Sequence, residues 1–157
     1  MPFRISGLSA APFHHLYGLN DLALKEFGVV RYQAKENSGF PDRIEMRDAL
    51  PGETVLLLNH VYQPEETPFK ASHAIFVREG AYETYDRIDE IPPVMKTRLL
   101  SLRGFDEAHM MVEADVVEGR SVIELIEHLF SNPDIAYIHA HNARQGCFAG
   151  RIDRIQI

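Results

Sequence analysis

Reactive side chains gather in one short segment near the end of the chain. Residues 137–151 hold two histidines, an asparagine, two arginines and the only cysteine of the printed sequence, arranged around one turn. His139 and His141 are two residues apart in a run typical of a β-strand, so both side chains are expected on one face of a sheet. This spacing suits either a metal ion or an activated thiol.

The first hypothesis is a metal site. Two imidazoles on one strand face supply two ligands, and a third from a neighbouring strand would complete the set that zinc or non-haem iron uses. His73 is the candidate third ligand because it lies in another strongly apolar strand, and Asp115 or Glu113 offers a carboxylate instead. In the structural alternative, His139 and His141 are half-buried strand residues that bond to carbonyl groups or face solvent.

The second hypothesis is a catalytic thiol, in which a histidine holds Cys147 as a thiolate. A four-residue turn would pair Asn142 with Cys147 and His141 with Phe148, which places the thiol on the face opposite the histidines. A turn of three or five residues would pair His141 with Cys147 directly. Gly146 favours this odd turn because it suits a bulged, left-handed position, although a four-residue turn also accommodates glycine. The structural alternative is an inert, buried cysteine.

A third hypothesis concerns ligand binding by arginines on predicted strands. Arg78, Arg103 and Arg151, with Asn142 beside them, would hold a carboxylate or a phosphate group. The structural alternative is that these arginines belong to solvated strand faces.

Asp115 is the carboxylate that we expect to assist a reaction at Cys147 and His141. It shares one strand face with Glu113, and two carboxylates on one face can do general acid–base work. The polar side of an alternating strand explains the same pattern without chemistry.

The composition narrows the class of protein. A chain of 157 residues is expected to form a single globular domain over residues 1–157. The formal charge of −7 and the lack of a basic stripe argue against a nucleic acid partner. No apolar run approaches about 18 residues and no signal peptide is visible, so no membrane partner is expected. A single cysteine suits a reducing compartment, which makes the cytoplasm the expected location.

The hydropathy pattern predicts the elements that position these residues. Asn20 resembles an N-cap for a helix that ends at Gly28, and Ser121-Val122-Ile123-Glu124 resembles a capping box for a helix that ends at Asn132-Pro133. A third, short helix is expected after Pro92. Strands are expected over residues 3–6, 29–34, 54–62, 72–79, 99–105, 110–117, 135–142 and 147–155.

The order of these elements indicates the fold class. Strands 54–62 and 72–79 are joined by a loop too short for a helical crossover, and strands 99–105 and 110–117 form a second hairpin. Apolar residues at positions 122, 126, 129 and 130 give the last helix one buried stripe. We therefore expect an α+β fold, with one mixed, mainly antiparallel sheet and two or three packed helices.

Several segments together carry a resemblance to a known family. They are residues 52–59, residues 72–78, residues 110–115, and residues 137–142 with Gly146-Cys147. Over nearly the whole chain the sequence resembles a bacterial family classified only as a domain of unknown function, number 1203. The resemblance implies no activity, because the family has none assigned. Its members often carry a cysteine after Gly-Phe-Pro, where this chain has Asp42, and that departure argues against any scheme that needs two thiols.

Two classes of function follow from these observations. The absence of a nucleophile elbow, a P-loop or an HExxH motif favours a small-molecule-binding or structural module whose hairpin residues form a hydrogen-bonded network. The alternative is a metal-dependent or Cys/His enzyme centred on His139, His141 and Cys147. The two classes differ in whether these residues and His73 converge on one cavity.

Overall fold

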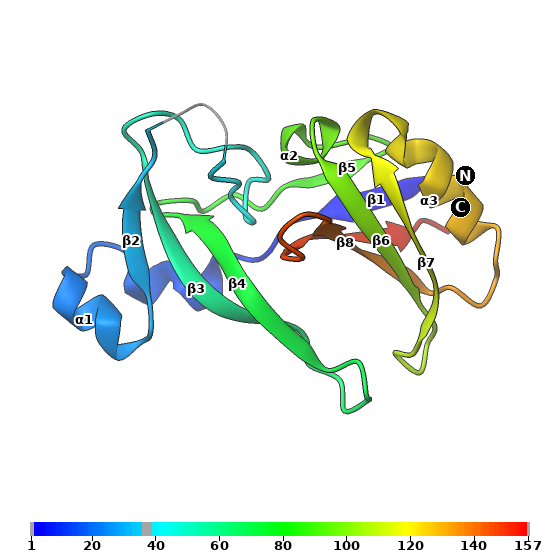
Figure 1. Ribbon diagram of the computed structural model, residues 1–157, viewed down its shortest axis with the longest axis horizontal. Coiled ribbons are helices and arrows are strands. Elements are labelled where there is room, and N and C mark those ends of the chain that lie inside the picture. The colour runs from blue at the N-terminus through cyan, green and yellow to red at the C-terminus, as the bar shows by residue number, and fades with distance from the viewer. Residues whose placement is uncertain (1, 36–38, 157) are drawn as a thin grey trace.

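Two antiparallel sheets form the framework of the computed structural model, which describes residues 2–35 and 39–156 (Figure 1). The larger sheet has six strands in the order β5-β1-β9-β8-β6-β7, and all its neighbouring strands are antiparallel. These strands are β1 (Phe3–Ser6), β5 (Asp86–Ile88), β6 (Leu99–Phe105), β7 (Met111–Glu118), β8 (Tyr137–Asn142) and β9 (Phe148–Arg154).

The smaller sheet has three strands in the order β2-β3-β4, which are β2 (Val30–Gln33), β3 (Thr54–Gln63) and β4 (Ala71–Arg78). The predicted antiparallel pairing of β3 with β4 is confirmed, and so is the hairpin of β6 and β7. The prediction of one mixed sheet is wrong, because β3 and β4 pair within the smaller sheet while β8 and β9 pair within the larger one. In the described part of the chain, the only parallel pairing is an isolated bridge between Asp42 and Phe76.

Short helices accompany the sheets. Asn20 caps the first helix as predicted, since its Oδ1 accepts the Ala23 N–H at 2.8 Å. Helices cover 18% of the chain against 39% for strands, so the helical part is smaller than predicted. No helix among the described residues is long and apolar enough to cross a membrane. The helices are α1 (Asp21–Glu26), α2 (Pro93–Lys96) and α3 (Val122–Phe130), with 3-10 turns η1 (Ala11–Leu16) and η2 (Gly119–Ser121).

The predicted capping box at Ser121 is wrong. Ser121 makes no side-chain cap bond, and its φ of −114° and ψ of 14° differ from the extended backbone of a normal N-cap. The chain enters α3 directly from η2, where Gly119 lies so close to the carbonyl of Met95 that a Cβ would clash. At this end of α3, η2 therefore packs closely against α2.

The predicted apolar stripe of α3 is buried against the larger sheet. Val122, Ile126, Leu129 and Phe130 are each 2% exposed or less, and they share a core with residues of β6, β8 and β9. Burying each such side chain stabilises the fold by roughly 1.5–3 kcal/mol. This core fixes β8 in the middle of the sheet. Because the turn that carries Cys147 begins at the end of β8, the core also fixes where that turn starts.

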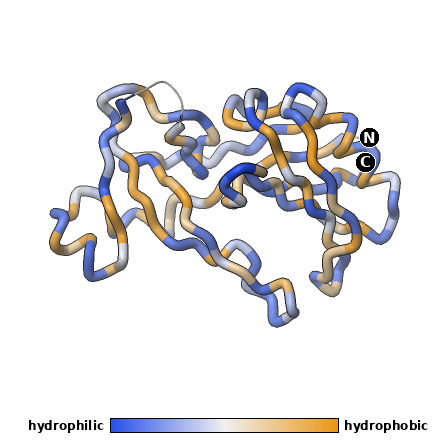
Figure 2. Tube along the Cα trace, in the orientation of Figure 1, coloured by the Kyte–Doolittle hydropathy of each residue, from blue (hydrophilic) through white to orange (hydrophobic). Residues whose placement is uncertain are grey.

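The loop of residues 39–48 packs between the two sheets. Its Met46 belongs to the core under α3, and its Ile44 belongs to a second core with Leu56 of the smaller sheet. Phe148 at the start of β9 joins that second core, so shared apolar contacts connect the sheets. Figure 2 shows hydrophobic residues along the strands of both sheets and hydrophilic residues at the tip of the β3–β4 hairpin. The loop is thereby held next to the β8–β9 turn.

Candidate functional site

The turn between β8 and β9 has four residues, 143–146. The Asn142 N–H donates to the Cys147 carbonyl at 2.9 Å, and the Gly146 N–H donates to the Asn142 carbonyl at 2.7 Å. His141 pairs with Phe148, so Cys147 lies on the face opposite the histidines. The odd turn that Gly146 favoured is therefore not formed, although Gly146 does have a left-handed φ of 80°.

The thiol of Cys147 lies beside a buried arginine rather than a histidine. Arg43 Nη2 donates to Cys147 Sγ at 3.0 Å, and Asn142 Nδ2 approaches the same sulfur at 3.5 Å. Cys147 itself is partly exposed. The thiol therefore has the two features of a reactive cysteine, access to solvent and an adjacent positive charge.

Arg43 is held rigidly by backbone carbonyls. Its Nε donates to the Phe148 carbonyl at 2.8 Å and its Nη1 to the Pro41 carbonyl at 2.6 Å, and the residue is 2% exposed. Burial lowers the pKa of the Arg43 guanidinium, and the attraction to Cys147 opposes that shift. Since arginine stays protonated in proteins, a positive charge is buried against the sulfur.

A pocket of about 250 Å³ opens beside this pair of residues. Its walls come from the loop 39–48, from β3 and β4, and from the β8–β9 turn. Arg98 and His73 contribute polar groups, and a neighbouring hollow that shares Arg98 and Asn142 extends the site toward Arg144. The pocket is lined by Gly39, Pro41, Arg43, Leu57, His73, Ala74, Ile75, Phe76, Arg98, Asn142, Gln145 and Cys147.

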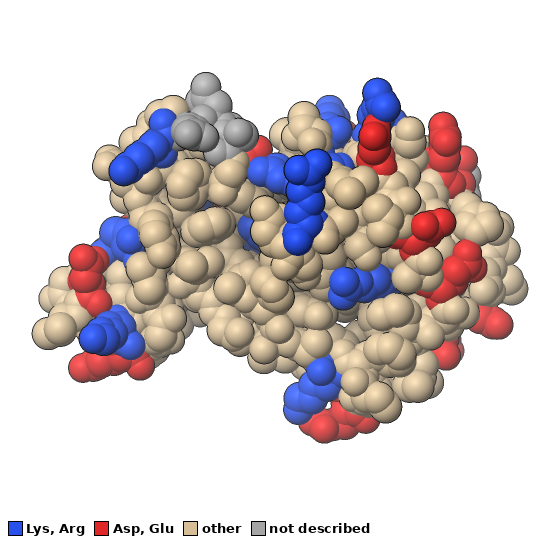
Figure 3. All heavy atoms as spheres, viewed as in Figure 1, with Lys and Arg blue, Asp and Glu red and all other residues tan. Residues whose placement is uncertain are grey.

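Positive side chains dominate this region. Neither the pocket nor the neighbouring hollow is lined by an aspartate or a glutamate. Figure 3 shows arginine and lysine side chains gathered at the centre of the view, where Figure 1 places the β8–β9 turn. The chain as a whole has a formal charge of −7, so this region is positive on a negative protein. A positive region of this kind attracts anions.

Asn142 lines the same pocket, and its side-chain oxygen is buried without a partner among the described residues. It is 6% exposed, and its Oδ1 has no hydrogen-bond partner among the described residues, while its Nδ2 faces the Cys147 sulfur. A buried acceptor without a partner costs free energy unless another molecule supplies a donor. Because this oxygen is enclosed by the protein, a molecule in the pocket does not contact it in this structure.

The histidine pair forms a separate, buried aromatic cluster. His139 is 3% exposed and His141 is 0% exposed, and their ring centroids are 6.5 Å apart. Tyr62 of β3 packs edge-on against His141 at 4.7 Å, and it stacks on Phe148 at 5.6 Å. Burial lowers the pKa of His139 to about 3 and that of His141 to about 4, so both rings are neutral near pH 7.

His141 also supports the turn that carries Cys147. Its Nδ1 lies 3.0 Å from the Gly146 carbonyl. Because a carbonyl only accepts, the ring proton is on Nδ1 and Nε2 is a lone-pair acceptor. His141 Nε2 and His139 Nδ1 are both buried without a partner in the described part of the chain. The contribution of His141 to the thiol site is therefore positional.

The expected metal site of His73, His139 and His141 is not formed. Within residues 2–35 and 39–156, no group of three or more His, Cys, Asp or Glu side chains could hold a metal ion. His73 lies on β4 in the other sheet, where its Nδ1 bonds the Ala74 carbonyl at 3.0 Å, and it lines the Cys147 pocket instead. The two strand histidines face aromatic rings instead.

The predicted arginine cluster is dispersed. Arg78 pairs with Glu45 at 2.8 Å, and Arg103 lies on β6 with its Nε at 3.3 Å from Ser101 Oγ. Arg151 lies 4.2 Å from the centre of the Tyr137 ring. None of these three arginines lines the pocket.

Asp115 also lies apart from the thiol. It is exposed on β7, the outer strand of the larger sheet, and its carboxylate accepts the Val116 N–H at 2.7 Å. It borders a surface depression with His128 rather than the pocket. Of the residues expected to act in catalysis or ligand binding, Cys147 and Asn142 line the pocket together, joined there by His73 from the expected metal set.

Arg43 and Arg98 line the pocket, although no motif in the sequence marks either as a site residue. Arg43 follows Gly39-Phe40-Pro41-Asp42, and 104 positions separate it from Cys147. Arg98 lies two residues after the end of α2 and bonds Asp48 at 2.7 Å. The one signal in the sequence is an arginine close to the apolar residues Ile44 and Met46. This signal does not indicate that Arg43 contacts Cys147.

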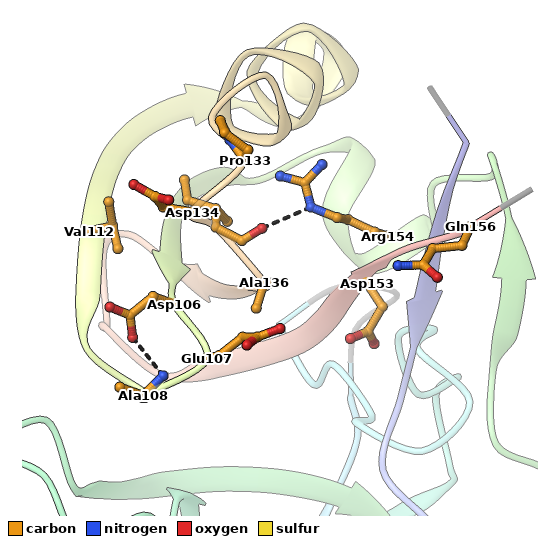
Figure 4. Close-up of a pocket in the computed structure, with 11 residues that line it drawn as sticks. Asp106, Glu107, Ala108, Val112, Pro133, Asp134, Ala136, Asp153, Arg154 and Gln156 are labelled. Atoms are coloured by element: carbon orange, nitrogen blue, oxygen red, sulfur yellow. Dashed lines mark hydrogen bonds between the residues drawn. The ribbon is translucent and has the colours of Figure 1, made fainter.

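A second hollow, of about 900 Å³, lies at the other end of the larger sheet (Figure 4). Its border carries the carboxylates of Asp106, Glu107, Asp134 and Asp153. Arg154 turns its guanidinium toward backbone carbonyls, among them that of Ile135 at 2.8 Å. Among the described residues, no buried side-chain atom that lacks a partner lies in this hollow. It offers less evidence of a ligand than the Cys147 pocket does.

Comparison with known proteins places the chain in a family. No curated protein and no solved structure matches it. One family model matches residues 39–154, a range that begins at the first residue lining the pocket and includes Arg43, Arg98 and Cys147. The chain therefore belongs to the family described as "Protein of unknown function (DUF1203)".

Proposed function

We propose that the protein binds a small anionic molecule in the Cys147 pocket. The observation that carries this proposal is a pocket lined by Arg43 and Arg98, with no carboxylate in its wall, in a chain with a formal charge of −7. Carboxylate and phosphate groups are the anions that guanidinium groups bind best.

Arg98 is positioned to receive such a group. It bonds Asp48 at 2.7 and 3.2 Å and the Val94 carbonyl at 2.9 Å. A guanidinium has five N–H donors, so these three bonds orient the side chain and leave donors for a ligand. A side chain that is already ordered loses little entropy on binding, which favours affinity.

The size and walls of the pocket limit the ligand. A volume of about 250 Å³ lies near the lower end of small-molecule sites, which suits a molecule of about amino-acid size. Leu57, Ile75 and Phe76 supply an apolar wall. The preferred ligand therefore has an anionic group and a short apolar part.

Titration with succinate, followed by NMR of ¹⁵N-labelled protein, tests this proposal. Succinate should shift the signals of the Asn142 side chain and the Arg43 Nε–H in a saturable way, and its uncharged diamide should not. Arg144→Gln should weaken binding because Arg144 lines the neighbouring hollow. Arg151→Gln removes an exposed arginine outside the pocket and serves as the matched control. Equal binding of the diamide, or equal loss in both variants, would contradict the proposal.

A further inference from the structure

We propose that the anion site takes organic diphosphates, with a short apolar group in the Cys147 pocket and the two phosphates in the hollows beside it. The inference rests on the proposed anion site and adds the class of ligand to it. Two observations carry it: the pocket adjoins two further hollows that share its arginine Arg98, and cations outnumber carboxylates in the walls of those hollows.

Three hollows meet around Arg98. The Cys147 pocket shares Arg98 and Gln145 with the neighbouring hollow, which has a volume of about 540 Å³. The neighbouring hollow shares Arg98 and Arg144 with a third one of about 500 Å³, here called the outer hollow. The site therefore extends well beyond the pocket itself, and a ligand longer than an amino acid can occupy it.

Backbone hydrogen bonds fix the segments that line these hollows. The Gly119 N–H of η2 donates to the Arg98 carbonyl at 2.8 Å, and the Ala143 N–H of the β8–β9 turn donates to the Leu99 carbonyl at 2.9 Å. Each of these two donors is followed in the chain by an arginine, and both arginines line the outer hollow. The fold thus brings three arginines from separate segments into one region.

The walls of the outer hollow carry an excess of positive charge. They include Lys96, Arg98, Arg120 and Arg144 but only one carboxylate, that of Glu118. Arg98 and Arg120 are each paired with a carboxylate, the latter with Glu118 at 2.6 Å. Lys96 and Arg144 have no hydrogen-bond or ion-pair partner among the described residues. Two cations therefore remain for an anionic ligand.

The donors of the two hollows suit a diphosphate better than a carboxylate. Thr97 adds its hydroxyl group to the guanidinium groups of Arg98 and Arg144 in the walls of both hollows. A carboxylate offers two oxygens to these donors, whereas a diphosphate presents three on its end phosphate and more on the inner one. The end phosphate carries a charge of about −1.5 to −2 at pH 7, and the inner phosphate adds to it. This charge matches two unpaired cations and a guanidinium with donors to spare.

The Cys147 pocket is suited to the other end of such a ligand. Leu57, Ile75 and Phe76 form an apolar wall around a volume of about 250 Å³, which admits a short apolar group. Because Arg98 lines the pocket and both hollows, a ligand bonded to it can place its apolar end in the pocket and its phosphates among the cations.

Three probes test the inference by isothermal titration calorimetry. Isopentenyl diphosphate has a short apolar group and two phosphates, isopentenyl phosphate lacks the second phosphate, and inorganic pyrophosphate lacks the apolar group. At pH 7, in about 0.15 M salt without divalent cations, isopentenyl diphosphate should bind about tenfold more tightly than either of the others. The overall charge of −7 repels the more highly charged probe, so its preference over the monophosphate requires local cations.

Two lysine variants locate the second phosphate. Lys96 lines the outer hollow and neither of the other two, so Lys96→Gln should reduce the preference for diphosphate over monophosphate from about tenfold to about threefold. Lys25→Gln removes an exposed lysine of α1 that lines none of the three hollows, and it should leave the preference unchanged. An equal fall in both variants would overturn the inference.

The wild-type affinities distinguish failure of the diphosphate assignment from failure of the anion site. If succinate binds but isopentenyl diphosphate binds no more tightly than isopentenyl phosphate, the diphosphate assignment fails and the anion site stands. Equal affinities for pyrophosphate and isopentenyl diphosphate would likewise overturn the placement of an apolar group in the pocket. If succinate and all three phosphate probes fail to bind, both proposals fail.

Discussion

Arg43 Nη2 lies 3.0 Å from Cys147 Sγ, although 104 positions separate the two residues in the chain. The contact joins the loop 39–48 to the β8–β9 turn, and the Arg43 Nε bond to the Phe148 carbonyl strengthens the same junction. A buried guanidinium between two carbonyls and a sulfur acts on structure and reactivity together. The carbonyl bonds fix the loop, and the charge faces the sulfur.

Arg43→Lys should slow the reaction of Cys147 with iodoacetamide about tenfold at pH 7. Lysine keeps a positive charge but cannot bond two carbonyls and the sulfur at the same time, so the sulfur loses its close contact with that charge. Because the printed sequence has one cysteine, total labelling reports this site alone. Urea unfolding of the variant checks that it is folded. An unchanged or higher rate in folded Arg43→Lys would show that the guanidinium does not activate the thiol.

Arg43→Met should lower the free energy of unfolding by about 3–5 kcal/mol. The change leaves the buried carbonyls of Pro41 and Phe148 without their donor and the sulfur without its counter-ion. Arg151→Met, at an exposed position on β9, should change stability by about 0.5 kcal/mol or less. Urea denaturation of both variants at pH 7 measures the difference, and similar losses in the two would contradict a structural role for Arg43.

The strands and most helix positions could be predicted because their signals are local. The apolar runs at 54–62 and 72–79 mark β3 and β4, and the stripe at 122, 126, 129 and 130 marks the buried side of α3. The division into two sheets depends on which strands pair, and the pairing of β1 with β9 connects opposite ends of the chain. Hydropathy along the chain does not show which strands pair with one another.

The site could be predicted only in part for the same reason. Cys147 and Asn142 stand out as candidate site residues in the sequence because they lie five positions apart in a segment rich in reactive residues. Cys147 and Asn142 lie on one face only because the turn between β8 and β9 has four residues, and Gly146 alone does not determine that length. Arg43 comes from a distant loop whose path is set by the packing of Ile44 and Met46 into different cores. The strand histidines have the predicted common face, but that face meets aromatic rings.

His139→Phe should make stability less dependent on pH between pH 7 and pH 5. In the unfolded chain histidine takes up a proton near its ordinary pKa of 6.5, whereas burial lowers the pKa of His139 to about 3 in the folded protein. The unfolded state therefore binds more protons as the pH falls below about 6.5, and the wild type loses stability. Phenylalanine keeps an aromatic ring and cannot take up a proton.

At pH 5 the wild type should thus lose about 1–2 kcal/mol more than His139→Phe, relative to pH 7. This pH window lies above the range in which Glu53 and Glu79, each with its pKa lowered to about 2, lose their contribution. Urea denaturation of both proteins at the two pH values provides the measurement. Parallel losses would mean that His139 does not stay neutral in the folded state.

His141→Phe should loosen the turn that carries Cys147, whereas His139→Phe should not. Both variants keep a ring against Tyr62 and Phe148, but only His141 donates to the Gly146 carbonyl, at 3.0 Å. Loss of that bond should cost about 1 kcal/mol and speed amide hydrogen exchange at residues 143–147. The iodoacetamide rate should also change in His141→Phe alone, because the turn sets the position of the sulfur against Arg43. Equal exchange rates in the two variants would show that the turn holds its shape without His141, and the histidine pair would then contribute only to packing.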